Sequence, residues 1–264
     1  MDRPEPVDLS ELLTFAGRTA RDAGRVLLEA RASGVRGRGV QRKAGTDIVT
    51  EADLRAERAI LEAVRSAYPG DAVLAEESGA TGESERRWAV DPLDGTVNFA
   101  NGLPYFAVSI ALEDAEGGLL GVVLSVEDDE LFSAGRGLPA RRNGTVMSEV
   151  GRAVRLSDAV VAMQLPAEML SAPGVFEQWM RSCRGIRMTG STAIDLAWTA
   201  LGRYDLMLYR RTTARWDWAA GELLIERTEG CAVRVIGEFG GMEVVAAGSA
   251  HLVRELEPGF VLGG

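Results

Sequence analysis

Cysteine and histidine are scarce in this chain of 264 residues, which contains two cysteines and one histidine. Cys183 and Cys231 lie far apart and belong to no paired motif, so the sequence predicts neither a disulfide framework nor a thiolate metal site. The single histidine, His251, lies near the C-terminus. Zinc sites and Ser-His-Asp hydrolysis are therefore both disfavoured.

Long apolar runs and an excess of basic charge are also missing. No stretch of about 18 uninterrupted apolar residues suggests a membrane span, and residues 1–6 contain no apolar signal core. With 39 acidic and 29 basic residues, the formal net charge is −10. We therefore expect a cytoplasmic protein that repels nucleic acid and anionic membranes and accepts divalent cations.

The length and a hydrophobic content of 46% are sufficient for one large α/β unit with a buried core. A shift in composition near Ala153 is the only sign of a boundary. We therefore expect an α+β half over residues 1–152 and an α/β half over residues 153–264, which share an interface within one compact unit.

Apolar periodicity predicts helices and a meander in the first half, and interleaved strands and helices in the second. In the first half we expect helices over residues 9–27 and 52–68, strands over residues 72–75 and from Trp88, and antiparallel strands over residues 105–112, 119–126 and 130–134. Residues 81–87 and 135–144 are expected to form a polar loop and turns. In the second half we expect strands over residues 159–164, 205–209, 231–236 and 244–247, and helices over residues 175–181, 191–201 and 216–228.

The strand that begins at Trp88 stops at two carboxylates, Asp91 and Asp94. Gly95 and Thr96 follow, and their small side chains would let backbone N–H groups approach an anion closely. One turn could therefore hold cations and a phosphate together. An Asp-Pro turn followed by an Asp N-cap explains the segment equally well and needs no function.

Other acidic residues recur where an apolar run meets a loop or a helix. Glu76 and Glu77 end one run, and Asp217 opens a predicted helix directly after Trp216. Oxygen ligands without a histidine partner suit Mg²⁺, which binds through a few carboxylates together with substrate phosphate. The recurrence favours a Mg²⁺ site over a simple turn at Asp91.

Four motifs, in order along the chain, resemble the signature set of the inositol monophosphatase family. They are Asp47–Asp53, Ala75–Ser78, Asp91–Phe99 and Trp216–Gly221, and the resemblance covers nearly the whole chain. It implies a layered αβαβα sandwich and a homodimer. It also implies membership of the lithium-sensitive, Mg²⁺-dependent phosphatase superfamily, which includes fructose bisphosphatases and bisphosphate nucleotidases.

The resemblance implies a role for each matched acidic residue. Glu76, Asp91 and the backbone carbonyl of Leu93 would hold one Mg²⁺, and Asp91, Asp94 and Asp217 would hold a second, in a site of two or three ions. Two cations at such a site can polarise a phosphoryl group and stabilise the leaving oxygen.

The remaining matched residues would act on water and on substrate. Glu76 and a Thr96 hydroxyl positioned by Asp53 would orient the attacking water. The amides of Gly95 and Thr96 would bind phosphate oxygens, and Lys43 would offset some of the carboxylate charge. The substrate loop of the family corresponds to Ser191, Thr192 and Ala193.

Several of these residues also have a purely structural interpretation. Asp53 fits a capping box with Thr50, and Asp217 fits an acid at a helix N-terminus. Lys43 lies in a basic loop, where solvation alone accounts for a lysine.

Arg210 departs from the family pattern. Inositol-specific members commonly place a glutamate seven residues before the last metal-binding aspartate, and this chain has arginine there. Guanidinium groups at the pocket rim, from Arg210, Arg211 and Arg215, favour a second phosphate or a carboxylate on the substrate. The alternative is that all three arginines face solvent or pair with surface acids.

These observations predict a Mg²⁺-dependent phosphomonoesterase that hydrolyses the phosphate ester of a small polyol, cyclitol or sugar. One alternative within the superfamily is a bisphosphate nucleotidase or a fructose-bisphosphatase-like enzyme. The alternative from another class is a noncatalytic homologue that binds metal or phosphate.

Overall fold

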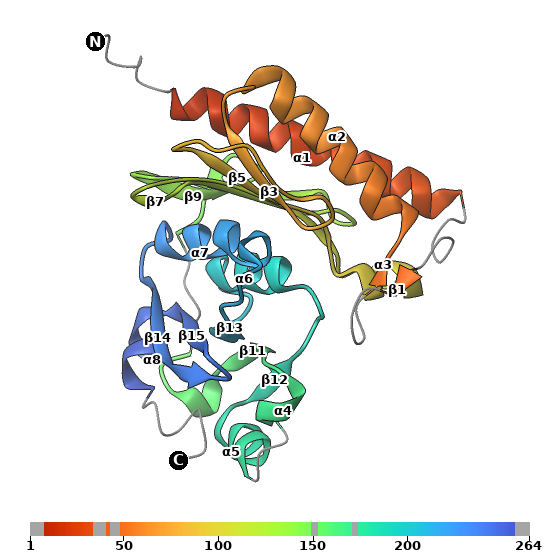
Figure 1. The fold of residues 1–264 in the computed structure, drawn as a ribbon. Coiled ribbons are helices and arrows are strands. Elements are labelled where there is room, and N and C mark those ends of the chain that lie inside the picture. The colour runs from red at the N-terminus through yellow and green to blue at the C-terminus, as the bar shows by residue number, and fades with distance from the viewer. Residues whose placement is uncertain (1–7, 34–40, 43–47, 149–152, 171–173, 257–264) are drawn as a thin grey trace.

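The computed structural model describes residues 8–33, 41–42, 48–148, 153–170 and 174–256. Helices and sheets alternate in five layers, which confirms the predicted αβαβα architecture (Figure 1). Lys43 lies outside the described residues. So do residues 149–152, which adjoin the expected boundary between the halves. The layers are formed by α1 (Leu9–Ala32) and α2 (Glu51–Ala67), an eight-stranded sheet, α6 (Thr192–Ala200) and α7 (Ala219–Glu226), a five-stranded sheet, and an outer set of short helices.

The first sheet has the strand order β10-β9-β8-β7-β6-β5-β3-β4. Strands β5 to β8 pair antiparallel, which confirms the predicted meander, whereas β3 runs parallel to β5. A parallel pair places both C-terminal ends at one edge of the sheet. The strands are β3 (Ala72–Ala75), β4 (Gly79–Thr81), β5 (Arg87–Asp94), β6 (Ala107–Asp114), β7 (Gly117–Ser125), β8 (Glu130–Gly135), β9 (Leu138–Arg142) and β10 (Thr145–Val146).

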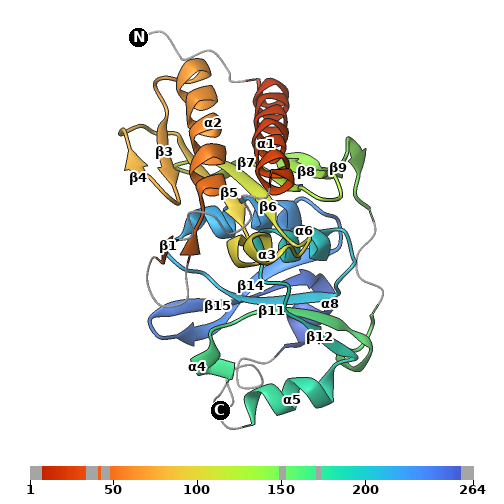
Figure 2. The same cartoon turned by 90° about the vertical axis from the view of Figure 1, so that its right-hand side faces the viewer.

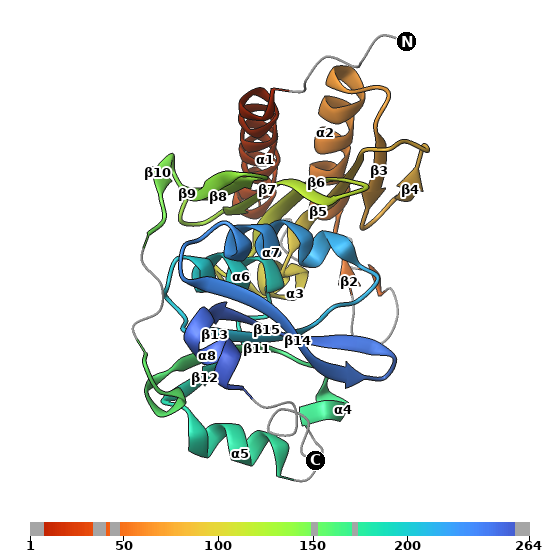
Figure 3. The same cartoon turned by 90° about the vertical axis from the view of Figure 1, so that its left-hand side faces the viewer.

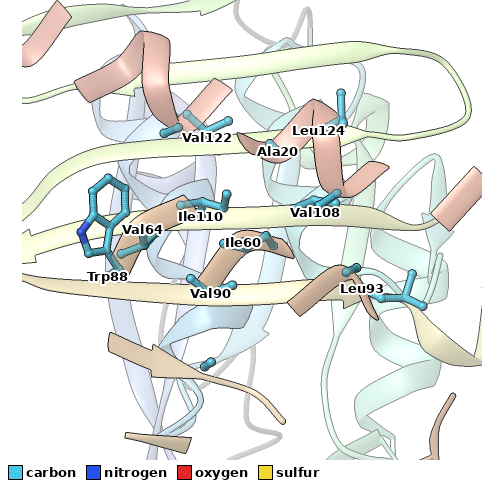
Figure 4. Close-up of a cluster of buried hydrophobic side chains, with 14 of the residues drawn as sticks. Ala20, Ile60, Val64, Trp88, Val90, Leu93, Val108, Ile110, Val122 and Leu124 are labelled. Carbon is cyan, nitrogen blue, oxygen red and sulfur yellow. The ribbon is translucent and has the colours of Figure 1, made fainter. Parts of the chain in front are cut away.

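Helices α1 and α2 cover one face of this sheet. Asp8 caps α1 by accepting a hydrogen bond from the Ser10 amide at 2.9 Å. In the close-up of Figure 4, Ile60 of α2 lies over Val90 and Ile110, all of them buried. Each such side chain contributes about 1.5–3 kcal/mol through burial, so this core fixes the position of β5.

The second sheet has the strand order β12-β11-β13-β15-β14, with β11 parallel to both β12 and β13. Short helices cover its outer face (Figure 2). Its strands are β11 (Val160–Gln164), β12 (Gly185–Arg187), β13 (Leu206–Arg210), β14 (Cys231–Phe239) and β15 (Met242–Ser249), and the outer helices are α4 (Ala167–Leu170), α5 (Val175–Ser182) and α8 (Ala250–Glu255).

Helices α6 and α7 form the layer between the two sheets (Figure 3). The fit is close at two glycines. A Cβ at Gly121 of β7 would lie 2.7 Å from the carbonyl oxygen of Ala220, and one at Gly221 would lie 2.5 Å from the Leu196 side chain. Glycine at these positions lets α7 approach both the sheet and α6.

Some expected boundaries were wrong. The helix expected over residues 216–228 is a 3₁₀ turn, η2 (Arg215–Asp217), followed by the separate helix α7. The region expected to contain only turns, residues 135–144, includes β9, which the sequence hides because its side chains are mostly exposed and Pro139 interrupts it.

Nine other short elements of the described residues were not predicted at all: α3 (Thr96–Asn101), η1 (Leu156–Asp158), the pair β1 (Gln41–Arg42) and β2 (Ile48–Val49), β4, β10, β12, α4 and α8. Each is too short to show a clear apolar period. Among the described residues, none of the helices has the length and apolar character that a membrane crossing requires.

Candidate active site

The ends of β3 and β5 bring Glu76 and Asp91 together. The two strands are parallel and in register, with Ala75 opposite Val90, and the Glu76 amide donates a hydrogen bond to the Val90 carbonyl at 3.1 Å. Glu76 therefore continues β3 directly beside Asp91. The pairing explains why two acids separated in sequence reach one place.

Asp91 is 2% exposed, and its Oδ1 accepts a hydrogen bond from the Leu93 amide at 2.9 Å. Burial raises the pKa of Asp91 well above its usual value, and the negative charges of Glu76, Asp94 and Asp217 raise it further. The other three carboxylates therefore lie close enough to Asp91 to disfavour its ionised form. No described arginine forms an ion pair with Asp91 or Asp94.

Asp217 reaches this cluster from the second half of the chain. Ser109 of β6 lies opposite Asp91 in the sheet, and its Oγ donates a hydrogen bond to the Trp216 carbonyl at 2.9 Å. That bond ties η2 to the strand next to Asp91. Asp217, the last residue of η2, is thereby held near the other acids.

Asp94 is anchored by the first turn of α6. Ser191 is the N-cap of α6, and its Oγ and the Ala193 amide both donate to Asp94 Oδ2 at 2.6 Å. Burial raises the pKa of Asp94 to about 6, and these two hydrogen bonds oppose the increase. The helix thus orients the carboxylate and favours its ionised form.

Thr96 and Asp53 form the third part of the site. The Thr96 hydroxyl lies 3.1 Å from Asp53 Oδ1 and 3.1 Å from the Leu93 carbonyl oxygen, and it can donate to either. Asp53 also accepts from the Thr50 amide and hydroxyl, so the expected capping box is present together with the contact to Thr96. Burial raises the pKa of Asp53, and its hydrogen bonds oppose the shift.

The donor set of this cluster suits Mg²⁺. Its members are carboxylates and a backbone carbonyl, and the mutual repulsion at Asp91 is what bound cations would relieve. In the described residues, no three acidic, histidine or cysteine side chains already surround a single point. Both donors from α6 meet Asp94 on Oδ2, so Oδ1 is the Asp94 oxygen that would face an ion.

Comparison with known proteins gives the same assignment as the motifs. A profile of the inositol monophosphatase family matches residues 8–257. The chain belongs to the inositol monophosphatase family.

Named relatives and a solved structure agree with this assignment. An inositol-1-monophosphatase from Mesorhizobium japonicum is 39% identical, over 91% of this chain and 90% of the relative. A protein of Pseudomonas aeruginosa called Nus factor SuhB is 35% identical, over 88% of this chain and 87% of the relative. The crystal structure of the extragenic suppressor protein suhB from Bartonella henselae has a TM-score of 0.86 at 34% identity, covering 96% of this chain and all of that one.

The structure separates the three arginines that precede the Trp216–Gly221 motif. Arg211 pairs with buried Glu222 of α7 through two hydrogen bonds of 2.6 and 2.8 Å. Arg215 pairs with buried Glu113 of β6, with one hydrogen bond at 2.9 Å. Arg210, at the end of β13, forms no ion pair with any described residue and is half-buried. Arg211 and Arg215 thus pair with acids, as the alternative interpretation expected. Their partners, however, are buried acids and not surface ones.

Three residues that support this family site were missed at the level of sequence. Glu57 lies one turn after Asp53 on α2, is 4% exposed, and accepts a hydrogen bond from the Glu77 amide at 2.8 Å. Ser109 and Asn98 tie neighbouring segments, with Asn98 donating to the carbonyls of Tyr105 and Thr189. Two of them carried a signal: Asn98 lies within the Asp91–Phe99 motif, and Glu57 shares one helix face with Asp53 because the two are four residues apart.

Proposed function

We propose that this protein is a Mg²⁺-dependent phosphomonoesterase acting on a small polyol, cyclitol or sugar phosphate. The observation that carries the proposal is the acidic cluster in which the charges of Glu76, Asp94 and Asp217, three partly buried residues, raise the pKa of buried Asp91. Burying Asp91 among these charges is unfavourable, and a bound cation would offset that cost. Membership of the family gives the reaction class.

The metal assignments remain those that the resemblance implies. Glu76, Asp91 and the Leu93 carbonyl would hold one Mg²⁺, and Asp91, Asp94 and Asp217 would hold a second. Bound Mg²⁺ would neutralise phosphoryl charge and lower the pKa of a nearby water. Because Asp91 belongs to both sets, it is the residue whose loss should matter most.

The hydroxyl of Thr96 has a defined part in this scheme. By donating its hydrogen to Asp53 Oδ1, it leaves its lone pairs to accept from water, which would orient that water toward phosphorus. Glu76 would assist from the end of β3. The amides of Gly95 and Thr96 would bind phosphate oxygens; Gly95 has φ 98°, a conformation that favours glycine.

Phosphate release tests the proposal directly. Asp94→Asn should lower release from a panel of inositol phosphates and sugar phosphates by about 100-fold or more at saturating Mg²⁺, and EDTA should abolish it. The control is Glu83→Gln, an exposed acid outside the cluster, which should leave the rate unchanged. A rate that persists in EDTA, or that Asp94→Asn does not change, would refute the mechanism. Inhibition by Li⁺ and a dimeric mass by light scattering are further expectations from the family.

Arg210 gives the finer proposal about substrate. Because Arg211 and Arg215 are held by Glu222 and Glu113, Arg210 is the rim arginine that remains available for an anionic group of the substrate. We expect Arg210→Glu to shift preference from bisphosphates toward neutral polyol phosphates. Arg211→Glu is not a suitable control, since it would break a buried pair; Arg184→Glu, on the surface, is suitable.

The outcomes also separate the alternatives. A preference for 3′-phosphonucleotides or sugar bisphosphates would favour a bisphosphate nucleotidase or a fructose-bisphosphatase-like enzyme. Binding of Mg²⁺ and phosphate without turnover of any ester would favour a noncatalytic homologue.

A further inference from the structure

Another buried carboxylate lies close enough to Asp94 to respond to its charge, and it takes no part in the scheme above. Asp195, in the first turn of α6, is 0% exposed. Its two oxygens accept hydrogen bonds from Gln164 Nε2 and Thr189 Oγ1, each at 2.9 Å. Burial raises the pKa of Asp195 to about 7, and these donors oppose the shift.

The contact with Thr189 continues toward Asp94. Because the Thr189 hydroxyl can donate its hydrogen to Asp195, its lone pair is free to accept from the Ser191 amide, which lies 3.2 Å away. Asn98 fixes the same turn from the other side by donating to the Thr189 carbonyl at 2.8 Å. Gly190, between Thr189 and Ser191, has φ 83°, and a Cβ added there would lie 3.3 Å from the Asn98 side chain.

The turn that these bonds hold is the one that delivers two donors to Asp94. Ser191 Oγ and the Ala193 amide meet on one oxygen, Asp94 Oδ2, and a small displacement of the turn would lengthen both bonds. Asp94 Oδ1 is left for other partners. The orientation of Asp94 therefore depends on residues that do not touch it.

We propose that Asp195 is a positioning residue that acts through Thr189 to hold Ser191 and Ala193 against Asp94. The proposal rests on the proposed function in one respect, namely that Asp94 is a Mg²⁺ ligand. Outer hydrogen bonds of this kind commonly change metal affinity by about tenfold or more. A purely structural role for Asp195, as an acid near the N-terminus of α6, would instead affect only stability.

The test compares two isosteric variants in the same helix region. Thr189→Val removes the hydroxyl that links Asp195 to Ser191, while the Asp195 charge stays in place. Thr199→Val is the matched control, because it removes a buried hydroxyl that donates to the Asp195 carbonyl at 2.6 Å and has no link to Asp94. Both variants should lose comparable thermal stability.

Two readouts then distinguish positioning from stability. Titration with Mg²⁺ alone should show about tenfold weaker binding for Thr189→Val and for Asp195→Ala, but not for Thr199→Val. Asp195→Asn, which keeps an acceptor for Thr189, should bind Mg²⁺ more tightly than Asp195→Ala. Hydrogen exchange followed by NMR should be about tenfold faster at the Ala193 amide in Thr189→Val than in Thr199→Val.

Equal exchange rates at Ala193 in Thr189→Val and Thr199→Val would overturn the proposal, whatever the enzyme does. If the wild-type protein neither binds Mg²⁺ nor releases phosphate, the proposed function fails, and the exchange rates still decide whether Asp195 positions the turn.

Discussion

Two groups of acidic side chains in this fold differ in the charge that lies next to them. Beside α7, in what we term the paired region, Asp114, Glu113 and Glu222 each face an arginine, and Arg211 and Arg215 also lie over the Trp218 ring. At the ends of β3 and β5, in the acidic cluster of Glu76, Asp91, Asp94 and Asp217, carboxylates face one another.

The difference shows how to recognise a binding site among many acids. An arginine partner lowers the pKa of a carboxylate, as Arg136 does for Asp114, and makes the pair part of the structure. The opposite shift at Asp91 marks a carboxylate that no arginine of the described residues neutralises. Arg215 and Asp217 lie two residues apart, yet each belongs to a different region.

The largest expected effect concerns the cation. Adding Mg²⁺ at roughly 100 times its dissociation constant should raise the free energy of unfolding by about 2.7 kcal/mol in the wild type. Asp91→Asn should remove most of this gain, because Asp91 belongs to both proposed metal sites. Denaturant unfolding of both proteins with and without Mg²⁺ measures this gain in the free energy of unfolding. An equal gain in both proteins would place the cation elsewhere.

The next effect concerns the paired region. Glu222→Gln should lower the free energy of unfolding by about 2 kcal/mol, since it leaves Arg211 without its buried partner and weakens the bond from Tyr209. Urea unfolding in EDTA provides the measurement. Glu116→Gln, which alters an exposed acid near the same arginines, should change stability by less than about 0.5 kcal/mol.

Replacing an acid by its amide in the acidic cluster should change the free energy of unfolding in the opposite direction. In EDTA at about pH 8, Asp94→Asn should raise the free energy of unfolding by about 1 kcal/mol, because an ionised group with a raised pKa destabilises the folded state. A loss of stability similar to that of Glu222→Gln would mean that the two regions do not differ as described.

A smaller effect follows from pH. The pKa of Asp94 is raised to about 6, so the folded state binds a proton more readily than the unfolded chain. Its contribution to stability therefore increases as pH falls from about 8 toward about 5. In EDTA, we expect the wild type to gain up to about 1 kcal/mol over this range relative to Asp94→Asn. Parallel pH curves for the two proteins would contradict the assignment.

Much of the fold was predictable because its long elements bury one face. The bounds of β3 agree with the expected strand over residues 72–75, since a short apolar run ends there at two acids. Mostly exposed strands at or next to a sheet edge, such as β4 and β9, carry no such pattern. Their formation depends on neighbouring strands, which a local sequence window does not contain.

The site was predictable only where chemistry was concentrated in motifs. Asp91 and Asp94 stand out at the end of an apolar strand, but nothing in the sequence shows that Ser109 ties the Trp216 carbonyl beside them. The same holds for Asp195, which reads as an ordinary acid of a helical first turn. Contacts between residues about 100 positions apart arise from the packing of layers and leave no local trace.

The close fit of α7 against β7 at Gly121 also bears on inheritance. Backbone atoms of Ala220 occupy the space that any side chain at Gly121 would need, so this strand and this helix are matched to each other. Because those atoms belong to the backbone, they are present whichever residue stands at position 220, and the constraint falls on position 121. A descendant that replaced this glycine would have to move α7 away from the sheet before the shared layer could form again.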